Sequence, residues 1–336
     1  MANLRAGILM KQRAAGEITA VKRPGSVAHL LSTLFQYRYF YLILIPAIAY
    51  YIIFAYVPMY GSILAFKDFD VRGGILGSPW TTHNGFGHFY DMFRNSDFNS
   101  ALRNTVLISV GRLVIEFPLP ILLALLLNEV VRRRYKGFLQ TVFTFPHFIS
   151  WVVIGGIFLT MFGDSGLVNQ VIVVLGGHKT NVLTNPSTYR MFLYFSDGWK
   201  ESGWSSIIYL ASISSINPEL YESAGMDGAN RLQLAWYVTL PSILSVIGIL
   251  FVLQVANLMN GSTNFGGGFD QIFNLYNPAV YSTAEIIDTY IYRRTFFTGL
   301  DWGSATAIGL FKSLINFALL IVANQVVKKT TGHGIY

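Results

Sequence analysis

Ionisable side chains that interrupt long apolar stretches are the residues most able to do chemistry in this sequence. Arg112 and Glu116 lie four residues apart, so on a helix they share one face and can form an ion pair. Lys312 lies near the middle of another apolar stretch, with Asn316 one turn further on. Inside a membrane such groups are costly, and they mark either a functional cavity or a mutual pair. For Lys312 two alternatives stand: it faces a wet cavity, or it pairs with Glu201 or Glu116.

Two other apolar stretches combine aromatic rings with amides and a carboxylate. Aromatic rings can stack on the apolar face of a sugar, and amides can bond its hydroxyl groups. The same side chains also pack between helices or anchor them at the membrane surface, and these alternatives remain open. The residues are Trp199, Glu201, Trp204 and Tyr209 in the first stretch, and Gln254, Asn257 and Asn260 in the second.

Residues for covalent or metal-dependent catalysis are missing from the sequence. The absence of cysteine excludes disulfides, Cys-ligated zinc, iron–sulfur clusters and thiol catalysis. Residues 176–180 lack the leading glycine of a phosphate-binding loop, and no Ser-His-Asp order or H-E-x-x-H pattern is present. His83 and His88 share a loop with Asp91 and could bind a metal there. Histidines in polar loops are more often ordinary surface residues than metal ligands. We therefore expect a protein that is not an enzyme and binds no metal or cofactor itself.

Composition places the chain in a membrane. Its 336 residues are 53% hydrophobic and only 12% charged, with a mean hydropathy of +0.47. Soluble domains carry about 25% charged residues. The net charge of +7 can indicate nucleic-acid binding. Here the Lys and Arg residues lie mostly beside apolar segments, so the positive-inside rule explains them and no nucleic-acid partner is expected.

Six segments are long and apolar enough to cross a membrane. A hydrocarbon core of about 30 Å requires about 20 apolar residues in a helix. The sequence predicts an all-α polytopic membrane protein with an interfacial or re-entrant segment at 167–175 and an amphipathic helix around 283–294. The predicted spans are residues 37–60, 101–128, 138–162, 199–216, 242–259 and 303–327.

Basic residues predict the orientation of these spans. The N-terminal tail at 1–36, the cluster at 132–136 and the pair Lys328-Lys329 fall on one side if there are six spans. The positive-inside rule assigns that side to the cytoplasm. Both tails, at 1–36 and 328–336, and the polar loop at 217–241 are therefore predicted to be cytoplasmic.

The loop at 217–241 carries strong helix signals although it lies between two apolar segments. Asn217 is a good N-cap, and Pro218 suits the first helical position. Small residues at 223–225 would allow a partner's backbone to approach closely, and Gly228 can end or bend the helix. The loop is predicted to form a helix, a bend and a second helix across the membrane surface, with one carboxylate at its tip.

The same loop resembles a known signature. Glu222-Ser223-Ala224, then Gly228 after three residues and Val238-Thr239-Leu240-Pro241 after nine more, resembles the pattern E-A-A-x3-G-x9-I-x-L-P of binding-protein-dependent ABC importer permeases. Ser223 and Val238 replace Ala and Ile, which are small changes of size. Further segments resemble a subgroup of these permeases for complex oligosaccharides, including uronate and alginate types, whereas residues 264–269 do not. The matching segments are 58–61, 65–69, 74–80, 102–105, 146–151 and 276–278.

This resemblance implies a type I ABC importer transmembrane domain in a bacterial cytoplasmic membrane. It implies a heterodimer with a second permease, two cytoplasmic ATPase subunits that use ATP-Mg, and an extracytoplasmic solute-binding protein. In the family the loop helix docks into a cleft of the ATPase, and its Glu pairs with a basic residue there. The implied coupling residues are Glu222, Ser223, Ala224, Gly225, Met226, Asp227, Gly228, Leu240 and Pro241.

The resemblance to maltose-type permeases also implies a sugar site on the fourth and fifth spans. Arg293, Arg294 and Lys312 hint at an acidic saccharide, although the two arginines can equally contact the binding protein or lipid. The predicted function is ATP-driven oligosaccharide import, and the alternative is an ion-coupled secondary transporter, which usually has repeated halves. The substrate-path candidates are Glu201, Trp204, Tyr209, Gln254, Asn257, Asn260 and Lys312.

Overall fold

The computed structural model describes residues 35–260, 268–299 and 301–332. The predicted N-terminal tail at 1–36, the segment 264–269 and the last four residues lie wholly or mostly outside this range. The chain divides into two compact units, residues 1–61 and residues 62–336. In the described residues both units are helical, apart from one antiparallel β-bridge between Lys67 and Trp80.

The first unit contains one long apolar helical segment. It consists of α3 (Arg38–Tyr51), a π-helical turn (Ile52–Tyr56) and α4 (Val57–Met59), and a 3-10 helix (Tyr60–Phe66) continues it into the second unit. Pro46 lies inside α3 without ending it. Together, Arg38–Phe66 are long and apolar enough to span a membrane.

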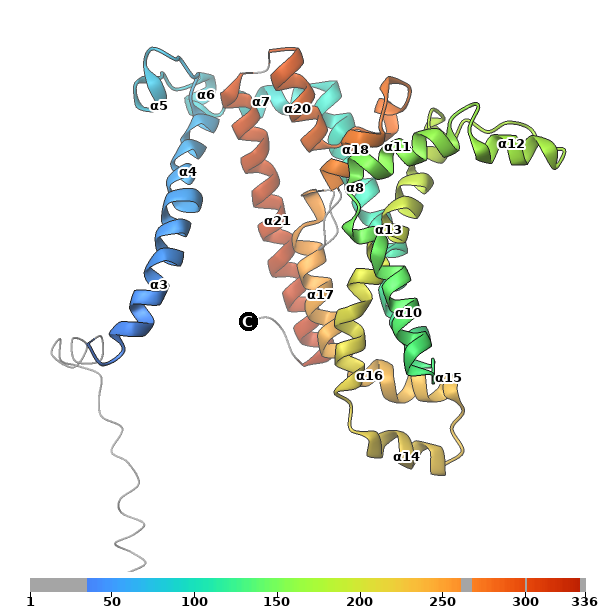
Figure 1. Ribbon diagram of the computed structural model, residues 1–336. Coiled ribbons are helices and arrows are strands. Elements are labelled where there is room, and N and C mark those ends of the chain that lie inside the picture. Colours follow the sequence, from blue (N-terminus) through green and yellow to red (C-terminus); the bar gives the residue numbers. More distant parts are fainter. Residues whose placement is uncertain (1–34, 261–267, 300, 333–336) are drawn as a thin grey trace, which may run out of the picture. The chain divides into compact units, whose positions relative to one another are not determined.

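The second unit is a bundle whose elements run between two ends (Figure 1). One end carries the short helices α14 and α15, and the other carries α18 and α20. The helices of this unit are α5 (Gly74–Gly77), α6 (Thr82–Gly85), α7 (Gly87–Arg94), α8 (Ser96–Ile115), α9 (Pro118–Asn128), α10 (Arg133–Thr144), α11 (Trp151–Phe162), α12 (Leu167–Val174), α13 (Pro186–Ser214), α14 (Pro218–Met226), α15 (Arg231–Leu234), α16 (Leu240–Ser242), α17 (Leu244–Ala256), α18 (Gly268–Leu275), α19 (Tyr281–Ala284), α20 (Ile287–Phe297) and α21 (Trp302–Thr331).

Four helical segments of the described chain meet the length and apolarity of a membrane span, or five if a bent pair counts as one. They are Arg38–Phe66, Ser96–Asn128, Trp151–Val174 and Trp302–Thr330, with the pair Arg231–Ser242 and Leu244–Ala256 bent by 64°. The helix that contains the predicted fourth span, α13, is long but too polar for this test. Asp197, Lys200 and Glu201 interrupt it, and each is buried.

The predicted third span at 138–162 is not one helix. It is divided into α10 and α11 by a 3-10 turn at Phe145–Phe148. Pro146 cannot donate a backbone hydrogen bond, and its ring disfavours a continuous helix. Ser150 then caps α11 by accepting a bond from Val153 N. In Figure 1, α11 turns away from the direction of α10 and leads to α12.

The helix that contains the predicted fourth span, 199–216, begins earlier than predicted. The helix α13 begins at Pro186 instead of 199, because Asn185 caps it by accepting a bond from Ser187 N and Pro186 occupies its first turn. The predicted short segment at 167–175 corresponds to α12, and the predicted amphipathic helix at 283–294 overlaps α19 and α20.

The core of the second unit is built around α13. One buried cluster joins α13 to α9 and α17 and includes Leu127, Ile213 and Leu250. A second cluster joins α13 to α11 and α18 and includes Phe158 and Ile272. This central helix therefore contacts both ends of the bundle and ends three residues before α14.

Candidate functional site

The loop helix α14 has a defined start and end. Asn217 Oδ1 accepts a hydrogen bond from Glu219 N over 3.2 Å. At the other end Gly228 adopts a φ of 81°, and Ala229 N donates to Ala224 O over 3.0 Å. This is a Schellman end, which requires the left-handed conformation that glycine adopts readily.

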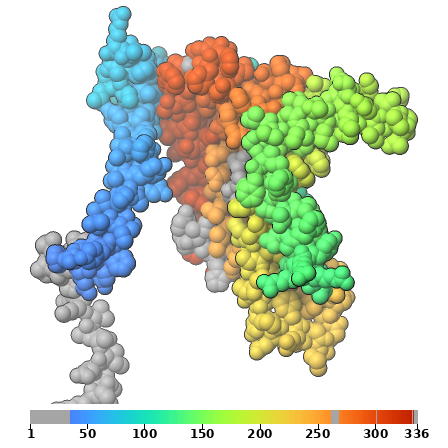
Figure 2. Space-filling model, viewed as in Figure 1, coloured from blue at the N-terminus to red at the C-terminus, as the bar shows by residue number. Residues whose placement is uncertain are grey.

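A second short helix follows the bend and connects α14 to the bundle. Asn230 and Gln233 form a reciprocal capping box at the start of α15. Tyr221 Oη lies 2.9 Å from the hydroxyl of Thr239, whose side chain is buried next to α16. Figure 2 shows this part of the chain as a projection at the lower end of the second unit. The predicted helix–bend–helix is therefore present, and one hydrogen bond fixes its inner face.

Most of the predicted coupling residues lie on the outer face of this projection. Met226 is 89% exposed, and no atom lies within 4 Å of the position that a Cβ on Gly225 would take. Ala224 is half-buried, and Leu240 and Pro241 lie where the chain re-enters the bundle. The exposed members are Glu222, Ser223, Gly225, Met226, Asp227, Gly228 and Pro241. The loop thus presents an exposed surface of mostly small residues that includes the carboxylates of Glu222 and Asp227.

A second candidate site is a polar pocket inside the bundle, between α9, α13 and α17. It brings together three of the predicted substrate-path residues: Glu201, Tyr209 and Gln254. We call it the bundle pocket. Its lining residues are Glu116, Phe117, Pro120, Asp197, Gly198, Glu201, Ser202, Ser205, Tyr209, Leu250 and Gln254.

Buried charges surround this pocket. The predicted pair is present, with Arg112 Nε 3.6 Å from Glu116 Oε1. Arg112 also lies 4.0 Å from Asp197 and donates to Gln271. Within the described residues, the carboxylate oxygens of Glu116 and Asp197 have no hydrogen-bond partner. Sequence reasoning missed Asp197, although it lies four residues before Glu201 on the same helix.

Glu201 is held by groups from two elements. Its carboxylate lies 2.8 Å from Lys200 Nζ and 2.7 Å from His147 Nδ1. His147 stacks on Trp204 with 4.5 Å between ring centroids. His147 lies in the break between α10 and α11. Trp204 does not line the bundle pocket.

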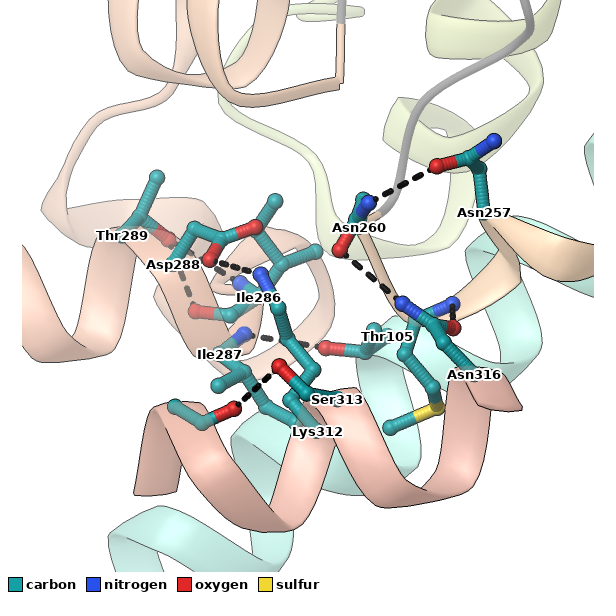
Figure 3. Close-up of polar contacts among 12 residues, drawn as sticks. Thr105, Asn257, Asn260, Ile286, Ile287, Asp288, Thr289, Lys312, Ser313 and Asn316 are labelled. Carbon is teal, nitrogen blue, oxygen red and sulfur yellow. Dashed lines mark hydrogen bonds and ion pairs between the residues drawn. The ribbon is translucent and has the colours of Figure 1, made fainter. Parts of the chain in front are cut away.

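Asn257 and Asn260 lie elsewhere, in a chain of amides at the end of α17 (Figure 3). Asn260 donates to Asn257 over 3.1 Å, and Asn316 of α21 donates to Asn260 over 3.1 Å. Asn316 also accepts from Met259 N over 2.9 Å. The amides therefore connect the end of α17 to α21.

Lys312 has a partner that the sequence did not suggest. It forms an ion pair with Asp288 of α20, as Figure 3 shows. The predicted pairing with Glu201 or Glu116 is wrong, because those carboxylates face Lys200, His147 and Arg112 instead. Asp288 and Lys312 lie 24 residues apart on different helices, so no local sequence pattern predicts the pair and only the fold brings them together.

The fold and the site together define a membrane permease. Long apolar helices enclose a polar pocket, and a capped surface helix projects from one end of the bundle. Residues 116–332 match the family described as the binding-protein-dependent transport system inner membrane component. The chain belongs to this family, and it is therefore a multi-pass permease component of an ABC importer that works with a solute-binding protein.

Relatives cover nearly the whole chain. It is 42% identical to the polygalacturonan/rhamnogalacturonan transport system permease protein YteP of Bacillus subtilis, over 91% of this chain and 93% of the relative. It is 37% identical to protein LplB of the same organism, over 97% and 98% of the two chains.

A solved structure shares the fold. A chain of a bacterial ABC transporter involved in the import of the acidic polysaccharide alginate superposes with a TM-score of 0.81 and 38% identity. The match covers 90% of this chain and 99% of that one. A bacterial alginate ABC transporter in complex with an alginate pentasaccharide-bound periplasmic protein also matches, with a TM-score of 0.81 and 37% identity over 91% of this chain and 99% of that one. The predicted all-α fold of type I importer permeases is confirmed.

Proposed function

We propose that this permease imports an oligosaccharide by alternating access, together with a second permease and two cytoplasmic ATPase subunits that hydrolyse ATP-Mg. The named relatives handle polygalacturonan, rhamnogalacturonan and alginate, which supports a saccharide cargo. The proposal includes cytoplasmic N- and C-termini, because the basic clusters of the sequence favour that orientation.

The surface of α14 carries this proposal. Its N-cap, its glycine end and the Tyr221–Thr239 bond fix the helix, while Glu222 remains exposed. A rigid, exposed helix with small residues beside a carboxylate suits docking into a cleft of an ATPase. In this proposal Glu222 pairs with a basic residue there, and rotation of the ATPases moves α14 and the bundle together.

The bundle pocket is the proposed part of the substrate path in this subunit. Its volume is only about 30 Å³ here, so the proposal requires the pocket to widen when the importer changes state. Glu201, Tyr209 and Gln254 offer an acceptor, an aromatic ring and an amide to a polyhydroxylated ligand. Membership of a binding-protein-dependent family argues against the alternative of an ion-coupled secondary transporter.

Replacing Glu222 by Ala tests the coupling surface. We expect ATP-driven saccharide uptake to be lost, and the ATPase subunits to dissociate more readily, because the exposed carboxylate contributes little to the fold. Glu219→Ala is the matched control, since it removes another exposed carboxylate from the same helix. Uptake and ATPase co-purification would be measured with the assembled complex in proteoliposomes. Unchanged uptake in Glu222→Ala would refute the coupling role.

A further inference from the structure

A second pocket lies at the end of the bundle opposite α14, where α18, α19 and α20 meet. It has a volume of about 470 Å³, within the usual range of small-molecule sites. We call it the aromatic pocket. Its lining residues are Phe273, Tyr276, Tyr281, Tyr292, Arg293, Phe297 and Thr298. Five of these seven residues are aromatic, which distinguishes this pocket from the acidic bundle pocket.

The rings of the aromatic pocket hold one another in fixed orientations. Tyr276 and Tyr281 have centroids 4.9 Å apart, and Phe273 meets Tyr292 edge to face at 5.0 Å. Tyr276, Tyr281 and Tyr292 are each only partly exposed. Such packing holds the rings in place, so ligand binding would cost little side-chain entropy.

A charge-matched pair lies at the same place. Arg293 donates from Nε to Glu285 over 2.6 Å and from Nη2 over 3.0 Å, and Glu285 is buried. These hydrogen bonds raise the pKa of Arg293, so the guanidinium remains charged. Its centre also lies 5.5 Å from the centroid of the Tyr281 ring. Nη1 stays outside this bidentate pair and supplies donors of fixed direction.

We propose that the aromatic pocket is a saccharide subsite at the outer end of the permease, where one sugar ring stacks on Tyr281 or Tyr292 and its hydroxyl groups bind Arg293. This inference rests on the proposed function, and it adds a second contact point far from the bundle pocket. Aromatic faces match the apolar C–H face of a sugar, and planar polar groups match its hydroxyls.

The subsite recognises the sugar ring more than its charge. Glu285 already neutralises Arg293, just as Asp288 neutralises Lys312. Neither cation therefore has an unmatched charge to attract a uronate. The subsite is expected to bind neutral and acidic sugar rings with similar affinity, and selection for an acidic cargo then falls to other components of the importer.

The test uses the complete transporter in nanodiscs without its solute-binding protein. The probes are a galacturonic acid trisaccharide and a neutral galactose trisaccharide, and saturation-transfer NMR measures their binding. Tyr281→Leu and Tyr292→Leu remove a ring face but keep apolar volume. We expect each to weaken binding of both probes by about three- to tenfold. Tyr90→Leu is the control, because Tyr90 is an exposed tyrosine of α7 outside the pocket.

Three outcomes would overturn the subsite. Leucine variants that bind both trisaccharides as well as the wild type exclude ring stacking. Binding of the acidic probe alone excludes recognition of the ring without its charge. Weaker docking of the unliganded solute-binding protein, with saccharide binding unchanged, would assign the pocket to protein contact. Uptake tests the proposed function separately. If the wild-type assembly with its binding protein takes up neither saccharide, the proposed function fails, whereas unchanged binding by the leucine variants refutes the subsite alone.

Discussion

Neutralising the carboxylate of Asp288 should destabilise the bundle, because Lys312 of α21 loses its ion-pair partner. The two side chains form an ion pair and are only 15% and 23% exposed, for Lys312 and Asp288 respectively. The Asp288→Asn variant keeps the size of the side chain and removes its charge. Lys312 is then left with a positive charge in an apolar helix and without its observed partner.

The burial of the pair sets the size of the effect. Losing one partner of a fully buried ion pair costs about 3–5 kcal/mol, whereas an exposed pair contributes about 0–1 kcal/mol. The exposure of this pair lies between those limits, so Asp288→Asn should lower the free energy of unfolding by about 2–3 kcal/mol. Lys312→Met should cost less, about 1–2 kcal/mol, because Asp288 is the more exposed partner.

The double variant Asp288→Asn with Lys312→Met separates pairing from substrate contact. It contains no unmatched charge, so its stability should return to within about 1 kcal/mol of the wild type. Thermal unfolding of the detergent-solubilised protein measures this. Asp288→Asn should shift the midpoint down by about 4–12 °C, at about 2–4 °C per kcal/mol. Uptake by the double variant then shows whether Lys312 also serves the cargo.

Three results would refute this account. The double variant could be as unstable as the sum of its parents, which would mean that the charges do not compensate each other. Alternatively, Lys312→Met could be rescued by Glu116→Gln instead of Asp288→Asn, which would restore the pairing first suggested by the sequence. Wild-type stability of both single variants would also contradict the ion pair.

Two further variants test the packing and the substrate path. Gly203→Ala would place a Cβ 2.0 Å from Phe143 O, so α13 and α10 must separate at a cost of about 1–3 kcal/mol. Gly156→Ala in α11 meets no atom within 4 Å and should unfold no earlier than the wild type, and equal midpoints for the two variants would contradict the close contact. Gln254→Ala should lower transport affinity or rate in an assembled complex, because Gln254 lines the bundle pocket, and unchanged kinetics would remove this amide from the substrate path.

Local signals made the α14 region predictable. Asn217, Pro218 and Gly228 act on neighbouring backbone groups, so their effect depends on sequence spacing alone. The structure places the cap and the bend as the spacing indicated. Asn185-Pro186 carries the same N-cap and first-turn proline signal. The start of α13 was nevertheless not predicted, because the first part of this helix is too polar to stand out as an apolar segment.

Contacts between distant residues could not be predicted. Arg112 and Glu116 are neighbours on one helix, and their pairing follows from helical geometry. Asp197 and Asp288 become partners of Arg112 and Lys312 only when separate helices pack together. Proline was also misjudged: membrane helices tolerate it, but Pro146 coincides with a 3-10 turn that redirects the chain.

The polarity of α13 follows from its position between the two candidate sites. Its charged residues are buried against α8 and the 145–148 turn, where Arg112 and His147 match them. Gly203 brings the same helix against the backbone of α10, and such a close contact leaves little freedom to slide. Because α13 ends three residues before α14, a force applied at Glu222 reaches a helix that is already tied to its neighbours. Under the proposed mechanism, the bundle pocket would move with α13 as a rigid part, so a carboxylate on the surface could act on a buried site without contacting it.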